Sequence, residues 1–91
     1  MQKITMFTMD SCPYCKQAHK WMKEVFEAYP QYAEIPLTII DEAKHPEIAE
    51  KYDYYYVPTY YIGSEKVHEG AASYDIIRDV FEKAYKAEES I

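Results

Sequence analysis

Residues 9–18 read MDSCPYCKQA and contain the two cysteines of the 91-residue chain, Cys12 and Cys15. The stretch KITMFTM at 3–9 is rich in β-branched and large apolar residues, which predicts a central strand covered on both faces. Proline is favoured at the first position of a helix, so Pro13 predicts that a helix starts there with Cys12 as its N-cap. The cysteines are therefore expected at a strand-to-helix turn.

The helix that begins at Pro13 is expected to end before Pro30, because the residue before a proline is biased away from the helical conformation. Its lysines lie mostly on the side opposite to its apolar residues, as in an amphipathic helix that covers a core. The apolar face consists of Ala18, Trp21, Met22, Val25, Phe26 and Tyr29.

The rest of the chain continues to alternate between strand-like and helical segments. EIPLTIID at 34–41 predicts a second buried strand, HPEIAEKY at 45–52 a short helix, and PTYYIGSEKVHEG at 58–70 two strands around a turn at 63–65. Ser73 is predicted to cap a last amphipathic helix. The order β-α-β-α-β-β-α, with a right-handed first crossover, predicts an α/β fold. We expect a four-stranded mixed sheet flanked by helices, in one domain over residues 1–91.

Composition narrows the class of protein. The chain carries 16 acidic residues against 10 Lys and Arg, which argues against nucleic acid or an anionic membrane as a partner. Two cysteines are too few for a secreted disulfide scaffold, and MQKITMFTMDS at 1–11 lacks the apolar run of a signal peptide. A cytoplasmic monomer is therefore expected.

The predicted position of the cysteines suits redox chemistry. At the N-cap, the Cys12 sulfur can face the free N–H groups of the first helical turn, which stabilise a thiolate, and Lys16 is expected to add to this effect. Cys15 lies on the same helical face, within disulfide reach and one turn deeper. An exposed thiolate beside a shielded partner is what thiol–disulfide exchange requires, with Cys12 attacking and Cys15 resolving.

A structural metal site is the main alternative for a cysteine pair. Zinc needs four ligands, and apart from the pair only His19, His45 and His68 remain, with no second cysteine pair and no paired histidines. No metal ligands are therefore predicted. His19 follows Cys15 by four residues and is expected on its side of the helix.

Two segments resemble known families. CPYC at 12–15 resembles the glutaredoxin active site, and IAEKYDYYYVPTYYIGSEKVHEG at 48–70 resembles the corresponding part of thioredoxins. The resemblance implies a thioredoxin-like fold and a dithiol oxidoreductase that reduces protein or small-molecule disulfides, with roles in electron transport and cell redox homeostasis. It also implies a cis peptide bond between Val57 and Pro58 beside the cysteines, with the Val57 backbone pairing with the substrate chain.

Tyrosine occurs 11 times, and six tyrosines crowd around Pro58. Tyr60 and Tyr61 must point to opposite faces of their strand, so at least one of them is expected to pack in the core. Tyr14 and Tyr56 are predicted to line a substrate groove together with Pro13, Val57 and Pro58, because aromatic residues with a polar tip favour interfaces.

No bound cofactor is expected, and the electron source is either glutathione or a reductant of the thioredoxin-reductase type. Glutaredoxins often use a lysine before the motif and a Gly-Gly pair after the hairpin to bind glutathione. Here Asp10 precedes the motif and Gly70 stands alone.

An alternative function is an iron–sulfur module, with Cys12 holding a cluster between two protomers as in some glutaredoxins. Pro13 stiffens the loop, which argues against cluster binding.

Overall fold

The computed structural model describes residues 1–87 and contains one mixed sheet in the strand order β2-β1-β3-β4. The elements are β1 (Ile4–Thr8), α1 (Pro13–Ala28), a 3₁₀ helix (Pro30–Glu34), β2 (Leu37–Asp41), α2 (Pro46–Ala49), β3 (Thr59–Ile62), β4 (Glu65–Glu69) and α3 (Tyr74–Lys86). This confirms the predicted α/β fold and element order. The 3₁₀ helix was not predicted; it places Tyr32 against Tyr29, with ring centroids 5.2 Å apart.

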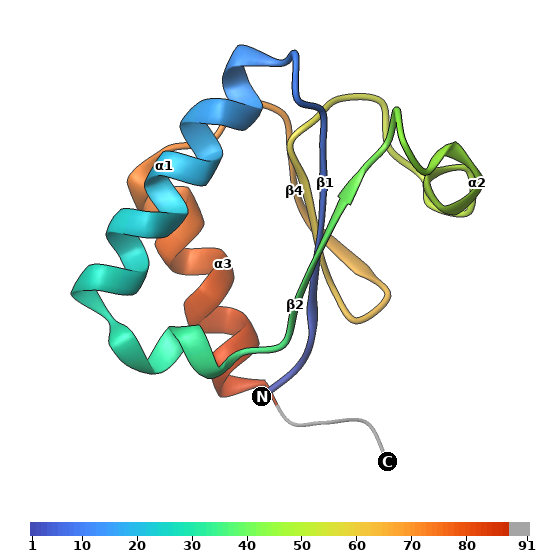
Figure 1. Cartoon of the computed structure of the whole chain (residues 1–91). Helices are drawn as coiled ribbons and strands as arrows, with labels where there is room; N and C mark the ends of the chain where they lie inside the picture. Colours follow the sequence, from blue (N-terminus) through green and yellow to red (C-terminus); the bar gives the residue numbers. More distant parts are fainter. Residues whose placement is uncertain (88–91) are drawn as a thin grey trace.

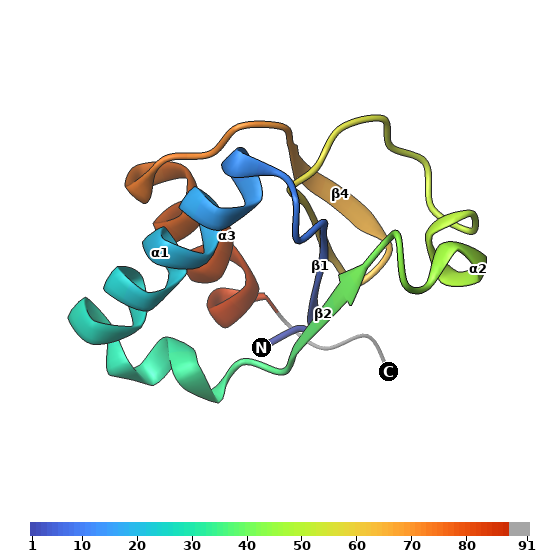
Figure 2. The same cartoon turned by 45° about the horizontal axis from the view of Figure 1, so that its top comes forward.

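The helices cover the sheet unequally. Figures 1 and 2 show α1 and α3 side by side on one face and the short α2 on the other. The larger core lies under α1 and α3 and includes Met6 and Tyr60. The smaller core on the α2 face contains Phe7, Ile40 and Tyr61. The prediction that Tyr60 and Tyr61 point to opposite faces is confirmed, and both side chains are buried.

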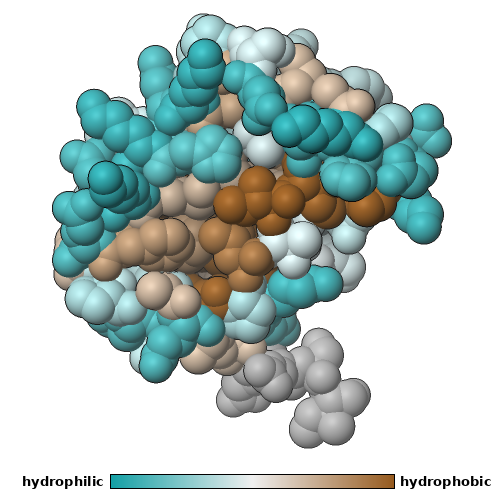
Figure 3. All heavy atoms as spheres, in the orientation of Figure 1, coloured by the Kyte–Doolittle hydropathy of each residue, from teal (hydrophilic) through white to brown (hydrophobic). Residues whose placement is uncertain are grey.

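The second strand predicted at 34–41 is confirmed at Leu37–Asp41, but the prediction that it is buried was wrong. β2 is an edge strand, paired only with β1, and Thr38 and Ile39 are exposed, Ile39 by 47%. Its run of apolar residues reads like a central strand, but only the sheet order decides which strand has two neighbours. A groove of about 440 Å³ runs between α1 and β2, and Figure 3 shows apolar side chains gathered across the middle of this face.

Strand pairing determines which loops meet at one edge of the sheet. β1 runs antiparallel to β3 with Phe7 opposite Thr59, so the residues after β1 lie beside those before β3. β1 runs parallel to β2 with Thr8 opposite Asp41, so the loops that follow both strands also converge there. This edge therefore collects the N-terminus of α1, the residues before Thr59 and the loop after Asp41.

The last helix starts as predicted. The Ser73 side chain accepts a hydrogen bond from the Ile76 N–H at 3.2 Å and so caps α3.

No helix within residues 1–87 combines the length and apolar character needed to cross a membrane.

Candidate active site

The cysteine pair occupies the start of α1. Cys12 is the N-cap, with extended backbone (φ −89°, ψ 118°), and Pro13 occupies the first turn, as predicted. The Cys12 carbonyl accepts hydrogen bonds from the N–H groups of Cys15 at 3.1 Å and Lys16 at 3.2 Å. Both thiols are free; Cys12 is partly exposed, whereas Cys15 is 1% exposed. The prediction that Cys15 is the more shielded sulfur is confirmed.

The two sulfurs differ in acidity. Burial works against ionisation of Cys12, but the nearby Cys15 N–H, Cys15 thiol and Tyr14 N–H favour the thiolate, outweigh burial and lower the Cys12 pKa. Burial raises the pKa of Cys15, and hydrogen bonds from Thr8 and the Met9 backbone only partly offset this. The exposed sulfur is thus the more acidic one. Lys16 is exposed one residue beyond the pair, and its contribution to the Cys12 pKa stays a prediction.

This difference in acidity has a measurable consequence. Since only the thiolate reacts with iodoacetamide, we expect Cys12 to be alkylated at neutral pH while Cys15 is spared, as read by peptide mass spectrometry. The alkylation rate of Cys12 should rise with pH around a midpoint below that of a free cysteine, as for other thiols activated at helix N-termini. A midpoint equal to that of a free cysteine would contradict this reading of the first turn.

The residues before β3 form the second wall of the site. The Val57–Pro58 peptide bond is cis, which confirms what the family resemblance implied. The Cys12 Sγ donates a hydrogen bond to the Val57 carbonyl at 3.8 Å, while the Pro58 side chain is fully buried. The structure therefore brings Cys12, Cys15, Val57 and Pro58 together, from two segments more than 40 residues apart in the sequence.

Polar groups surround the buried sulfur. The Thr8 side chain contacts Cys15, and the Thr8 Oγ1 lies 3.3 Å from the Nε2 of His19. On the side of the larger core, the Tyr60 hydroxyl is buried and has no hydrogen-bond partner among residues 1–87. Its burial, and to a lesser extent the nearby Cys15, raises its pKa. Thr8 thus lies between His19 and Cys15 in space. His19 is on the side of the helix where it was expected.

The charges near Cys12 include several that sequence reasoning missed. The Asp10 carboxylate pairs with Lys44 at 3.0 Å, and the Asp10 N–H donates to the Asp41 carboxylate at 3.3 Å. Glu42 raises the Cys12 pKa by its negative charge. Because parallel strands end at the same side of the sheet, the residues that follow Asp41 lie close to Asp10.

The tyrosines before Pro58 divide into packed and exposed side chains. Tyr54 stacks on Phe7 with ring centroids 4.8 Å apart, and its hydroxyl donates to Glu42 at 2.8 Å. Tyr55 is 86% exposed and Tyr56 69%, and Tyr14 in the first turn of α1 is 54% exposed. Of the predicted substrate-binding residues, Tyr14 and Tyr56 therefore present free rings to solvent, and Pro13 is exposed beside Tyr14.

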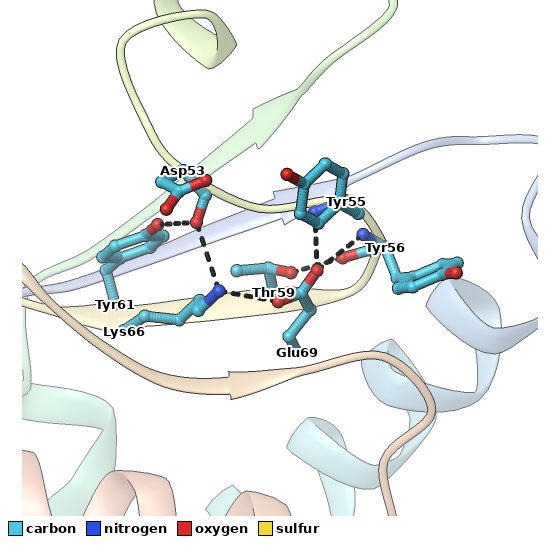
Figure 4. Close-up of polar contacts among 7 residues, drawn as sticks. All are labelled: Asp53, Tyr55, Tyr56, Thr59, Tyr61, Lys66 and Glu69. Carbon is cyan, nitrogen blue, oxygen red and sulfur yellow. Dashed lines mark hydrogen bonds and ion pairs between the residues drawn. The ribbon is translucent and has the colours of Figure 1, made fainter.

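A carboxylate from β4 holds the backbone of this loop (Figure 4). The Glu69 Oε2 accepts hydrogen bonds from the N–H groups of Tyr55 at 2.6 Å and Tyr56 at 2.9 Å, and the Lys66 ammonium donates to Oε1 at 2.7 Å. These donors lower the pKa of Glu69 to about 2, with Lys66 as the largest cause. We call this arrangement the Glu69 clamp. No sequence motif indicated it.

A metal centre has no support from the clustering of side chains. Within residues 1–87, no three His, Cys, Asp or Glu side chains come close enough together to hold a metal ion. His45 and His68, considered from the sequence as ligands, lie in other contacts: His45 pairs with Glu47, and the His68 ring lies 2.9 Å from the Ala71 carbonyl.

Comparison with known proteins supports the family resemblance of the sequence. Residues 2–82 match the family model of a thioredoxin domain. No curated protein sequence matches significantly. The fold is similar to that of oxidised thioredoxin from Plasmodium falciparum, with 23% identity and a TM-score of 0.68 over 92% of this chain and 80% of that one. A mutant thioredoxin from Halobacterium salinarum has 21% identity and a TM-score of 0.67, over 94% and 76%. A thioredoxin-like protein from Clostridium perfringens has 25% identity and a TM-score of 0.66, over 92% and 71%.

Proposed function

Because this chain belongs to the thioredoxin domain family, we propose that it is a dithiol oxidoreductase that reduces disulfides in proteins or small molecules and serves cell redox homeostasis. Family membership and the cysteine pair support thiol–disulfide oxidoreductase activity in general. The assignment of Cys12 as nucleophile and Cys15 as resolving residue is the specific part of the proposal.

The proposed reaction has two exchange steps. The Cys12 thiolate attacks one sulfur of the substrate disulfide, a Cys12–substrate disulfide forms, and the first substrate sulfur leaves as a thiolate that takes up a proton. Cys15 then loses its proton and attacks the Cys12 sulfur, which releases the second substrate thiol. Two electrons and two protons pass to the substrate, and the protein is left with a Cys12–Cys15 disulfide that a reductant must reopen.

One observation carries this proposal: the more acidic and more exposed Cys12 sulfur faces the Val57 carbonyl, while Cys15 is buried behind it. The direct test is reduction of insulin disulfides and of 2-hydroxyethyl disulfide by the pre-reduced protein, followed by loss of protein thiols. Reduction of neither substrate at a rate above that of free cysteine would overturn the proposal.

The substrate surface and setting are also proposed. We expect Pro13, Tyr14, Tyr56, Val57 and Pro58 to contact the substrate. The Val57 carbonyl lies 3.8 Å from the Cys12 sulfur, and Pro13, Tyr14 and Tyr56 are exposed, which supports this proposal. The protein is proposed to act as a cytoplasmic monomer, since reducing compartments keep such thiols free. Disulfide-containing proteins or small molecules are the proposed partners, with no nucleic acid or membrane.

The reductant is proposed to be glutathione or a reductase of the thioredoxin type. A glutaredoxin-like Pro-Tyr dipeptide favours equilibration with glutathione, at a potential of roughly −200 to −230 mV. The pocket is less suited to glutathione, since Asp10 is negative and Gly70, with φ at 95°, is followed by Ala71. We therefore expect glutathione-mixed disulfides on Cys12 to turn over slowly.

Replacing Asp10 with lysine tests this account of the pocket. The change removes a negative charge where a glutathione carboxylate would lie and frees Lys44 from its ion pair, so turnover with glutathione should rise several-fold. The gain should shrink in high salt, because exposed charges are screened. Glu24→Lys, on the exposed side of α1, makes the same charge change and should have no such effect. The argument would be contradicted if the gain in turnover did not depend on salt concentration, or if Glu24→Lys produced the same gain.

A further inference from the structure

The Glu69 clamp depends on an irregularity in the β3–β4 hairpin. Tyr60 pairs with His68, but Tyr61 pairs with Lys66, so Val67 is an extra residue in β4. Residues three apart in a regular strand point to opposite faces of the sheet. Here Glu69 pairs with Thr59 and Lys66 with Tyr61, and these two β3 residues share a face. The bulge thus turns Lys66 and Glu69 toward the same loop.

The loop is held along its whole length by this face of the hairpin. At its start, the Asp53 carbonyl accepts hydrogen bonds from the Tyr61 hydroxyl at 2.7 Å and from Lys66 at 3.2 Å. At its end, the Thr59 hydroxyl donates to the Tyr56 carbonyl. Glu69, whose side chain is 20% exposed, fixes the two N–H groups between these points. Figure 4 shows both N–H groups turned toward the carboxylate and both tyrosine rings turned away from it.

A fixed backbone that carries two exposed aromatic rings suits recognition more than stability. The rings of Tyr55 and Tyr56 bury little in the free protein, yet their backbone cannot reorganise without losing charge-assisted hydrogen bonds. A backbone that is already fixed loses little conformational freedom when a partner covers its side chains. The next residue, Val57, contacts the Cys12 sulfur through its carbonyl, so the loop that carries the rings ends beside the reacting atom.

We propose that Glu69 is a positioning residue for protein substrates: its carboxylate holds the loop so that the Tyr55 and Tyr56 rings receive the polypeptide on either side of a disulfide presented to Cys12. The inference rests on the proposed disulfide reduction and adds a preference for protein over small disulfides. A small disulfide reaches Cys12 without covering these rings, whereas an extended chain must pass over them. Glu69 touches neither the substrate sulfur nor Cys12 in this scheme.

The test compares two substrates and measures the rate at which pre-reduced protein is oxidised by insulin and by 2-hydroxyethyl disulfide. Glu69→Leu should slow the reaction with insulin about tenfold, mainly by raising the apparent KM, as expected from two lost hydrogen bonds, and change the other rate less than about twofold. Glu69→Gln should stay within about threefold of the unmodified protein, because one amide oxygen can still accept both N–H groups. Glu65→Leu, in the same strand and equally charged, is the control and should match the unmodified protein.

A double-mutant cycle separates positioning from general support of the fold. Tyr55→Ala combined with Tyr56→Ala should itself slow the insulin reaction selectively, and adding Glu69→Leu should then have less than about a twofold further effect. If Glu69→Leu does not fold, Glu69→Asp, whose shorter side chain withdraws the carboxylate, should show the same selective loss.

Three results would overturn the inference. They are an unchanged insulin rate in Glu69→Leu, an equal loss with both substrates, and full additivity in the cycle. The unmodified protein's rate with 2-hydroxyethyl disulfide does not involve the clamp. If the unmodified protein reduces neither insulin nor 2-hydroxyethyl disulfide, the proposed function fails and the inference with it. If both are reduced and Glu69→Leu leaves the selectivity between them unaffected, the inference alone fails.

Discussion

Serine in place of Cys12 is expected to abolish disulfide reduction, with a loss on the order of 10³-fold or more, as when other covalent enzymes lose their nucleophile. A serine hydroxyl is not ionised near neutral pH and cannot use the N–H groups that favour the Cys12 thiolate. The measurement is insulin reduction with dithiothreitol as the electron source, together with mass spectrometry of the protein after exposure to excess disulfide. No mixed disulfide should form on Cys15, which is 1% exposed.

Cys15→Ser is the matched control, since it makes the same chemical change three residues away. It leaves Cys12 able to attack but removes the thiol that would release the substrate, so a Cys12–substrate disulfide should accumulate. If Cys15→Ser forms no adduct and Cys12→Ser does, the order of attack proposed here is reversed.

The second large effect concerns stability, at the contact between α1 and α3. Phe81 is fully buried and meets Phe26 edge-on, with ring centroids 5.1 Å apart. Phe81→Ala should lower the free energy of unfolding by about 3–5 kcal/mol, through lost apolar burial and the cavity left behind. The free energy of unfolding of native domains is only about 5–15 kcal/mol, so this substitution would remove a large fraction of it. Urea unfolding of the reduced protein measures it.

Tyr55→Ala provides the comparison, because it also removes an aromatic ring but from an 86% exposed position. A surface substitution of this kind usually changes the free energy of unfolding by less than about 0.5 kcal/mol. Equal losses in the two variants would mean that the α1–α3 contact is not a main part of the core.

The local signals around the cysteines were sufficient to place them. Pro13 favours a helix start, and the apolar run before it favours a strand, so Cys12 was expected as the N-cap, and the structure confirms it. The Ser73 cap and the helical apolar spacing of the last helix were equally local and are also confirmed. These features depend on residues within a few positions of one another, which a sequence displays directly.

The same kind of reading failed for β2. LTII has the composition of a central strand, yet Ile39 is exposed because β3 pairs with β1 and no strand pairs with the other side of β2 among the described residues. Likewise, the sequence showed Asp10 before the motif but not its partner, Lys44, which the parallel pairing of β1 and β2 places 3.0 Å away. In both cases the outcome depends on a segment that is distant in the chain.

Short-range sequence patterns were sufficient to predict the fold class, the cysteine pair at a helix N-terminus and thiol–disulfide exchange as the general class of chemistry. Three features became visible only in the folded structure: the polar groups around the Cys15 sulfur, the contact of the Val57 carbonyl with Cys12, and the hold of Glu69 on the tyrosine loop. The Glu69 clamp needs a one-residue shift in strand register, and a bulge turns side chains to a new face without any composition that marks it. Pairing register is set by the whole sheet, so contacts that depend on it become visible only when the strands are assembled.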